Sequence, residues 1–584
     1  MTGAPHRVGK GRLRERITAP SYAIVPFGAM TSADGAAPIE ADRQVAAEGE
    51  PTPVRTAWWQ RLPREEATYE LTRLVLLRLL AFEYLAAFIG LALQVEPLLG
   101  ARGLLRAAGY VQAVRDQLGA GAFWRQPTLF WPGLLGTSDA ALRVASVVGV
   151  ALSIAALLGA TNALLQLALW ALYMSFVHVG QIFYGYGWEI QLLETGLVAV
   201  FFCPLRSVRP LPRTAAPKIP VWLFRWIIFR VMLGAGLIKL RNDPCWRDLT
   251  CLDYHFETQP NPNPLAWWFH HAPAWVHAAG VFFNHFVELV VPWFAFGFRR
   301  WRHAAGLLLV SLQVTLILSG NLSFLNWLTL IPAIACFDDT FFARFIPSSV
   351  RRSWLDRFVR LPTSRLQTRL TQAFAVIVAL LSIGPVANLA SCDQSMNQSF
   401  DPLDIVNTYG AFGTVDRARY EVVLEGTSDA APDQAARWEA YELPCMPGDL
   451  RRRPCIVTPY HYRLDWQMWF AGNGAARGEN MEREPWLVHL VWQLLEGEPG
   501  PRRLLARDPF PDAPPRWIRA GIWRYRFSES RRDGAWWTRQ SVGEALPALS
   551  ASNPRLRGYV DAYGWPDAPD APDTREREGA GEAP

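Results

Sequence analysis

The sequence predicts a polytopic α-helical membrane protein of about nine spans, followed by a β-rich domain on the extracytoplasmic side. Three observations lead to this fold class. Apolar residues make up 51% of the 584-residue chain, which is high for a soluble protein of this length. Apolar runs of helical length recur up to residue 390, and apolar–polar alternation with period two replaces them afterwards.

Several apolar runs are candidates for membrane spans, because a bilayer core of roughly 30 Å needs about 20 apolar helical residues. Some of them are short or interrupted. The candidates are residues 71–94, 141–160, 163–184, 188–203, 221–240, 281–298, 304–320, 322–337 and 372–390.

The positions of the arginines predict which side each loop faces, because short cytoplasmic loops are enriched in Lys and Arg. The basic segments are residues 55–73, 206–218, 299–302 and 344–369. With nine spans, all of these segments fall on the cytoplasmic side. Residues 241–280 and everything after residue 390 then lie outside the cytoplasm. Orientation in a bilayer explains the basic residues, so we expect no nucleic-acid partner despite the net charge of +6.

Composition divides the chain into four regions. Residues 1–54 and 551–584 are polar and compositionally biased, so we expect both to be unfolded tails. Residues 55–390 form the membrane domain, which includes the extracytoplasmic loop 241–280. Residues 391–550 form the β-rich soluble domain.

Within this soluble region, two stretches have the alternation of half-buried strands. They are "RYEVVLEGTSD" (419–429) and "WRYRFS" (523–528). The stretch "EPWLVHLVWQLLEG" (484–497) instead has apolar residues at helical spacing, and we expect a helix there.

The stretch "CLDYHFETQPNPNPLAWWFHH" (251–271) separates two apolar runs with a rigid, polar and aromatic segment. Pro-x-Pro geometry needs no internal hydrogen bonds, so its amides could cross a surface and stay free for binding. We expect a loop on the membrane surface that presents an aromatic face, either as an anchoring belt or as a binding surface for a polypeptide client. The client-binding candidates are Tyr254, His255, Gln259, Asn261, Asn263, Trp267, Trp268 and Trp275.

In this topology five cysteines lie outside the cytoplasm. They are Cys245, Cys251, Cys392, Cys445 and Cys455. Oxidising compartments favour disulfides, so we expect the close pairs 245/251 and 445/455 to be bridged, with Cys392 left over. Neither pair is a C-x-x-C motif, which favours a structural role over thiol exchange.

Ionisable side chains within apolar helices are costly and are therefore candidate site residues. Those that we expect in an intramembrane polar network are Glu189, Glu194, Arg230, His285 and Glu288. Lys239, at the end of "LGAGLIKL", has two interpretations: a lysine that reaches the interface, or a desolvated base.

Motifs for a metal or a cofactor are missing from the sequence. His285 and Glu288 share a helical face, but there is no clear third ligand, so we expect no metal. We find no phosphate-binding loop, no Gly-x-Ser-x-Gly elbow and no dinucleotide fingerprint, and we expect no cofactor. These observations favour a protein that is not an enzyme.

Several long, irregular strings are more specific than any short motif. They are "FRVMLGAGLIKLRNDPCWRDLTCLDYHFETQPNPNPLAWWFHHAPAWVH", "NHFVELVVPWFAF", "SGNLSFLNWLTLIPAIACFDD", "GYGWEIQLLETGLVAVFFCP" and "YHYRLDWQMWFA". These strings cover most of residues 70–530, and the chain resembles the lipase maturation factor family. The resemblance implies a multi-pass membrane protein that, in animals, resides in the endoplasmic reticulum and helps secreted lipases reach their active, assembled form. It also implies that large non-cytoplasmic domains contact the client.

A shorter likeness suggests an alternative. A Gly-x-x-Lys segment followed by Trp is similar to the membrane domain of vitamin K-dependent carboxylase. By that analogy Lys239, with His178, would be the base of a membrane enzyme. The Ala-, Arg- and Trp-rich composition predicts a bacterial inner-membrane protein with its C-terminal domain in the periplasm, or an endoplasmic reticulum protein if the source is eukaryotic.

Overall fold

The computed structural model describes residues 67–565 apart from 161, 206 and 351–360, and these residues belong to one compact unit, 66–584. The expected N-terminal tail, 1–54, lies outside the described residues.

Within this described part, six apolar helical segments are long enough to cross a membrane. They are α1 (Glu70–Leu99), α4 (Asp139–Leu158), α7 (Lys218–Asn242), α11 with the turns that continue it (Ala274–Phe296), α12 (Arg299–Ser319) and α16 with α17 (Arg365–Ala390). The other expected spans fall on α5 (Ala163–Val179), α6 (Gly187–Phe202) and α13 (Leu325–Ile334), which have 17, 16 and 10 residues. These are shorter than the roughly 20 residues that a span needs, so a count of nine is not confirmed.

The first helices pack closely through one small residue. Helix α4 begins behind Ser138, whose hydroxyl accepts a hydrogen bond from the amide of Ala141. At Gly149 of α4 an added Cβ would lie only 2.1 Å from the ring of Phe88 on α1, so the site requires glycine. Val144 and Val147, on the opposite face of α4, are exposed, as expected for side chains that face lipid.

A four-stranded antiparallel sheet follows the membrane helices. Its order is β2 (Glu439–Ala440), β1 (Arg419–Thr427), β3 (Trp517–Phe527) and β4 (Trp537–Leu549). The two stretches with period-two alternation therefore lie in β1 and β3, which pair with each other; Val422 opposes Ile522. Helix α18 (Arg463–Ala476) packs on β1 at Gly472, where an added Cβ would lie 2.3 Å from the carbonyl oxygen of Tyr420.

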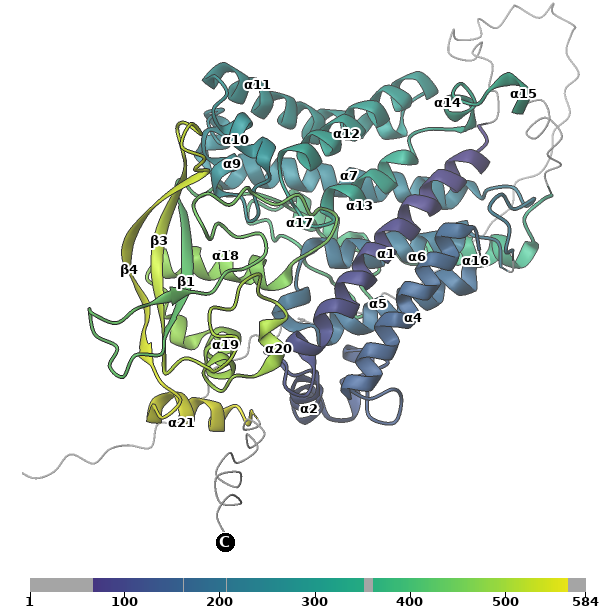
Figure 1. The fold of residues 1–584 in the computed structure, drawn as a ribbon. Helices are drawn as coiled ribbons and strands as arrows, with labels where there is room; N and C mark the ends of the chain where they lie inside the picture. Colours follow the sequence, from purple (N-terminus) through teal and green to yellow (C-terminus); the bar gives the residue numbers. More distant parts are fainter. Residues whose placement is uncertain (1–66, 161, 206, 351–360, 566–584) are drawn as a thin grey trace, which may run out of the picture. The chain divides into compact units, whose positions relative to one another are not determined.

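Short helices in the loop after α7 connect the membrane helices to this sheet. They are α8 (Pro244–Arg247), α9 (Leu252–Thr258) and α10 (Pro264–His270). Phe256 of α9 and Trp267 of α10 share a buried aromatic cluster with Tyr525, Phe527 and Trp537 of the sheet. Figure 1 shows α9 and α10 beside the upper ends of β3 and β4.

The C-terminal segment differs from the expected unfolded tail. Helix α21 (Pro554–Ala562) lies within residues 551–584 and buries Leu556 and Val560, which are one helical turn apart. Trp565 stacks on His489 of α19 (Pro485–Leu495) with ring centroids 3.8 Å apart. Three apolar side chains in a polar segment are thus enough to dock it.

The basic segments lie next to one another at one end of the membrane helices. Arg73 of α1 donates to the carbonyl of Thr214 at 2.7 Å, and Thr214 pairs with Leu361. Arg302 of α12 donates to Asp338 at 2.8 Å. The segment 206–218 therefore contacts both Arg73 and Leu361, and the segment 299–302 binds Asp338, which precedes the segment 344–369.

Candidate functional site

Residues 259–263, expected to be a free surface strap, form a buried connection between the membrane helices and the sheet. The Gln259 amide donates to the carbonyl of Ser319 at 2.9 Å, and the Asn263 amide donates to the carbonyl of Leu318 at 3.0 Å. Asn261 is 1% exposed. The expectation that these amides stay free is wrong, because they satisfy carbonyl groups at the end of α12, and buried polar groups need such partners.

Arg419, the first residue of β1, holds this connection from the sheet side. Its guanidinium donates to the carbonyl oxygens of Glu257 at 3.2 Å, Gln259, and Pro260 at 2.8 Å. The extended Pro-x-Pro backbone leaves carbonyls without helical partners, and the planar guanidinium supplies donors to several of them. Burial raises the pKa of the neighbouring Glu421 to about 7, although its ion pair with Arg419 opposes this shift.

Most of the expected client-binding side chains are not on the surface. Tyr254 is half-buried beneath the guanidinium of Arg417, 4.9 Å from it. Trp268 and Trp275 are 61% and 73% exposed. Five of the eight candidates are less than 10% exposed, so their side chains offer little surface to a client. They are His255, Gln259, Asn261, Asn263 and Trp267.

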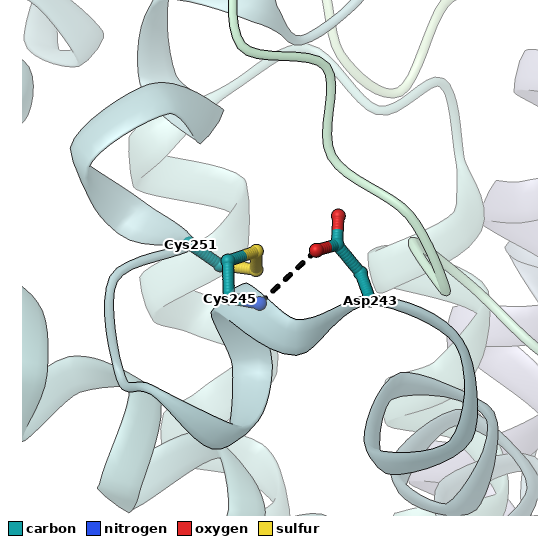
Figure 2. A group of neighbouring side chains, drawn as sticks. All are labelled: Asp243, Cys245 and Cys251. Carbon is teal, nitrogen blue, oxygen red and sulfur yellow. Dashed lines mark hydrogen bonds between the residues drawn. A yellow bond between two sulfur atoms is a disulfide. The ribbon is translucent and has the colours of Figure 1, made fainter.

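Cys245 and Cys251 form a disulfide beside Asp243, which begins helix α8 (Figure 2). The Asp243 carboxylate accepts from the Cys245 amide at 3.0 Å and from Arg417 at 2.8 Å. Burial raises the pKa of Asp243, but hydrogen bonds from Arg417 and two backbone amides outweigh it and hold the pKa below its usual value. A second disulfide joins Cys445 to Cys455.

The same three residues are spaced like metal ligands, since their ligand atoms lie within 4.8 Å of one another. The chemistry of the set does not fit an ion. Both sulfur atoms are bonded to each other, and the Asp243 carboxylate is taken by Arg417 and backbone amides. The group is a structural junction between the end of α7 and the soluble domain.

The ionisable groups of the membrane helices form separate pairs and not one network. Glu194 of α6 binds Arg230 of α7 and accepts from Tyr409 at 2.6 Å. Glu189 pairs with Arg463 at 2.8 Å. His285 lies apart from these carboxylates and contacts the carbonyl of Trp246 at 2.9 Å.

Lys239 is buried in a third pair. Its Nζ atom lies 2.5 Å from Glu288 and 3.4 Å from Asn284, and it lies over the ring of Trp246 at 5.0 Å. The side chain is therefore buried in an ion pair inside the protein. His178 has different partners, the carboxylate of Asp404 and a backbone carbonyl, so the structure does not join it to Lys239.

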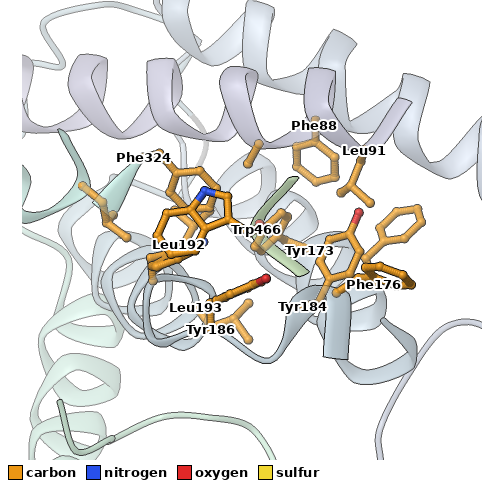
Figure 3. Close-up of a cluster of buried hydrophobic side chains, with 14 of the residues drawn as sticks. Phe88, Leu91, Tyr173, Phe176, Tyr184, Tyr186, Leu192, Leu193, Phe324 and Trp466 are labelled. Atoms are coloured by element: carbon orange, nitrogen blue, oxygen red, sulfur yellow. The ribbon is translucent and has the colours of Figure 1, made fainter. Parts of the chain in front are cut away.

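Arg463 of α18 was not among the site residues expected from the sequence. Its guanidinium binds Glu189, donates to the carbonyl of Phe183 at 2.5 Å, and lies 3.4 Å from the centre of the Tyr184 ring. Trp466, one helical turn further, enters the aromatic cluster between α1, α5 and α6 (Figure 3). The sequence did contain a signal for this missing partner. Helix α6 carries two glutamates, and Arg230 can pair with only one of them.

Two neighbouring cavities lie near these groups. One of about 140 Å³ is lined by α7, α11 and α12 and contains Lys239 and Glu288. The other, about 310 Å³, lies where the start of α6 meets α18 and is lined by Trp188 and Trp466. Phe412 lines both.

Apolar helices with paired internal charges, two cystines and a sheet domain fixed to one end define a class: a polytopic membrane protein with a tightly docked soluble domain. Comparison with known proteins identifies the family. A model described as "Lipase maturation factor transmembrane domain" matches residues 71–344, and one described as "Lipase maturation factor C-terminal domain" matches residues 405–547. The chain belongs to the lipase maturation factor family.

Curated relatives match over most of their length. Lipase maturation factor 1 of Bos taurus is 47% identical over 525 residues, which cover 85% of this chain and 92% of the relative. The Homo sapiens protein of the same name is 45% identical over 527 residues, covering 85% and 91%. Lipase maturation factor 2 of Homo sapiens is 31% identical over 614 residues, covering 85% of each chain. No solved structure matches the chain.

These comparisons correct two details of the sequence analysis. They provide no support for the likeness to vitamin K-dependent carboxylase. The matching relatives are animal proteins, so they do not support the bacterial setting suggested by the composition.

Proposed function

We propose that the protein is a membrane-embedded factor that assists the folding or assembly of secreted proteins, with lipases as the client class. The relatives' names supply the client class. The observation that carries the proposal is the fusion of loop 241–280 with the soluble domain through Arg419, Arg417 and a shared aromatic cluster. A rigid body of this kind can hold a surface in a fixed position against a client.

We infer the compartment from the positions of the basic segments and the cystines. The basic segments adjoin one another at the end opposite to this body, which supports a cytoplasmic position for them. The soluble domain would then face the space into which exported polypeptides emerge: the lumen of the endoplasmic reticulum in a eukaryotic cell, or the periplasm in a bacterial one. Two cystines in this body agree with an oxidising compartment.

The surface that we assign to the client centres on Trp268. This indole is 61% exposed on α10, which lies outside the candidate spans. Arg531 lies 6.0 Å from its ring and 3.8 Å from the ring of Trp536. Trp and Arg are the residue types that contribute most to protein interfaces. Trp275 is the second residue of a candidate span, so an interfacial anchoring role competes with client contact there.

The pairing of Lys239 supports a non-enzymatic role. The ammonium group of Lys239 is held by Glu288 at 2.5 Å and by Asn284 at 3.4 Å, whereas a general base must lie within hydrogen-bond reach of its substrate. Lys239→Arg would keep the ion pair, and we expect client maturation to persist in that variant.

Site-specific photo-crosslinking tests the proposal. A photoreactive amino acid replaces Trp268 in the full-length protein, in cells that express a secreted lipase. The matched control replaces Trp301, which is similarly exposed at 60% but lies on α12 at the basic end. We expect lipase adducts from position 268 and none from position 301. Lipid adducts alone at position 268, or equal lipase capture at both positions, would overturn the proposal.

A further inference from the structure

The 140 Å³ cavity beside Lys239 has a polar end and an apolar body. Lys239, Glu288, Asn284 and His255 form the polar end. The remaining lining is mainly apolar and comes from several elements, with Met232 of α7, Leu312 of α12 and Phe412 among its members. Two further polar residues in the lining, Gln313 and Asn326, bond to each other. Such a division, with a few polar groups at one end of an apolar hollow, is typical of sites for small amphiphilic ligands.

The polar end has an unused hydrogen-bonding group. His255 is 6% exposed, lines the cavity, and among the described residues its ring makes aromatic contacts with Phe256 and Phe412 but no hydrogen bond. A buried imidazole without a partner is costly, so a ligand that bonds to it would gain free energy.

The charges at this end cancel. Lys239 and Glu288 form a pair with no net charge. Burial, with a smaller contribution from Lys239, lowers the pKa of His255 to about 4, so its ring is neutral at physiological pH. An ionised head group would therefore meet no uncompensated opposite charge and would lose its hydration. A head group with hydroxyl and ester groups avoids that cost, because the hydroxyl can both donate and accept and the ester carbonyl can accept.

The cavity has an opening toward the lipid-facing side of the membrane helices. Gly280 and Phe283 of α11 line it on one side, and Thr315 and Leu316 of α12 line it on the other. Thr315 is exposed. Both helices are candidate spans, and Thr315 lies one turn before the end of α12, so we infer that this opening faces lipid near the end of the spans.

We propose that this cavity binds a membrane amphiphile with an uncharged, hydroxyl-bearing head group, of the monoacylglycerol class. Its head group contacts His255 and the Lys239–Glu288 pair, and its acyl chain leaves between α11 and α12. The volume fits this division, because a cavity of about 150 Å³ takes a molecule of the size of benzene. The cavity therefore holds the head group and the first carbons, while lipid surrounds the rest of the chain. This inference does not depend on the client proposed above.

Photolabelling of the full-length protein tests it. The protein is placed in phosphatidylcholine nanodiscs with a monoacylglycerol that carries a diazirine near its head group, or with the matching ionised fatty acid. Thr315→Trp fills the opening. Val314→Trp is the matched control, since Val314 is exposed on the same helix but does not line the cavity. Thermal unfolding confirms that both variants are folded.

We expect monoacylglycerol adducts on peptides from α7 and α12, about tenfold fewer in Thr315→Trp, and no change in Val314→Trp. His255→Phe, which keeps the ring volume but removes both nitrogens, should also weaken labelling by monoacylglycerol. Adducts that map elsewhere, equal labelling of the two tryptophan variants, or preferential labelling by the fatty acid would each overturn the proposal. Copurification of a polypeptide segment in the cavity would overturn it as well.

Discussion

The two ends of the membrane helices satisfy their buried arginines in different ways. At the basic end, Arg225 and Arg302 bind carbonyl groups and a carboxylate that follow α13 in the same domain. At the opposite end, Arg419 and Arg463 come from the soluble domain and bind groups of the membrane domain. The arginines at the first end find their partners within the membrane domain. At the second end, pairing requires arginines of the soluble domain.

This difference shows that the soluble domain is part of the membrane domain's charge balance. A carboxylate buried in a helix bundle costs several kcal/mol if it loses its partner. Glu189 is 0% exposed, and its charged partner belongs to α18. We therefore expect the stability of the membrane domain to depend on the soluble domain, although the sequence separates the two.

The largest expected effect is that of Arg463→Ala. It leaves Glu189 buried and unpaired, and we expect a loss of about 3–5 kcal/mol in unfolding free energy. A thiol-reactive dye can follow unfolding of the membrane domain, because Cys203 and Cys336 are buried and free. The exposed Cys392 is first replaced by serine to remove background labelling.

A double variant separates the charge from the packing. Glu189→Gln combined with Arg463→Met removes both charges and keeps most of the volume, so most of the lost stability should return. If Arg463→Ala leaves dye labelling of the membrane domain unchanged, the coupling between the two domains is refuted.

A smaller effect is expected from Arg302→Ala at the basic end. Arg302 donates to the carbonyl of Cys336 and to Asp338, each at 2.8 Å, but Asp338 keeps Arg299 at 3.0 Å. The remaining partner limits the expected loss to about 2 kcal/mol. Limited proteolysis of the soluble domain should show no change, whereas Arg463→Ala should speed its cleavage. Equal protease sensitivity of the two variants would contradict the contrast between the ends.

The smallest expected effect is a pH dependence of the unfolding free energy. Burial raises the pKa of Asp465 on α18 to about 7, although the Cys445 amide donates to it at 2.6 Å. The unfolded pKa is about 3.9, so the protonated form favours the fold. This contribution is complete below pH ~4 and is lost as pH rises through 7, by roughly 1 kcal/mol between pH 6 and 7.

Asp465→Asn should remove this dependence, which melting temperatures at pH 6 and pH 7 would measure. Asp338, at the basic end, provides the contrast. Burial raises its pKa, but hydrogen bonds from His303 and Thr340 and nearby cations outweigh this and hold the pKa below its usual range. Asp338 therefore stays ionised between pH 6 and pH 7. An unchanged pH dependence in Asp465→Asn would exclude Asp465 as its source.

The sequence predicted the apolar segments, the alternating strands and the nearness of cysteine pairs, because each depends on residues close together in the chain. Local periodicity identified β1 and β3, and a separation of 6 residues identified the Cys245–Cys251 pair. The helix around α19 was found for the same reason. The family resemblance came from long irregular strings, which are confirmed by the matching family models.

The burial of residues 259–263 could not be predicted locally. A Pro-x-Pro segment looks the same whether its carbonyls face water or a guanidinium, and Arg419 is 159 residues from Pro260. The docking of α21 was missed because a biased composition concealed two apolar residues at helical spacing. The exposure of Trp268 and the burial of Trp267 also depend on packing against the sheet.

The pairing of Glu189 with Arg463 also sets an order of events during synthesis. The two residues are 274 positions apart in the chain. At a translation rate of roughly 5–20 residues per second, Arg463 is synthesised on the order of tens of seconds after Glu189. During that interval Glu189 of α6 has no charged partner from α18. The packing around Glu189 is therefore complete only after translation has delivered α18.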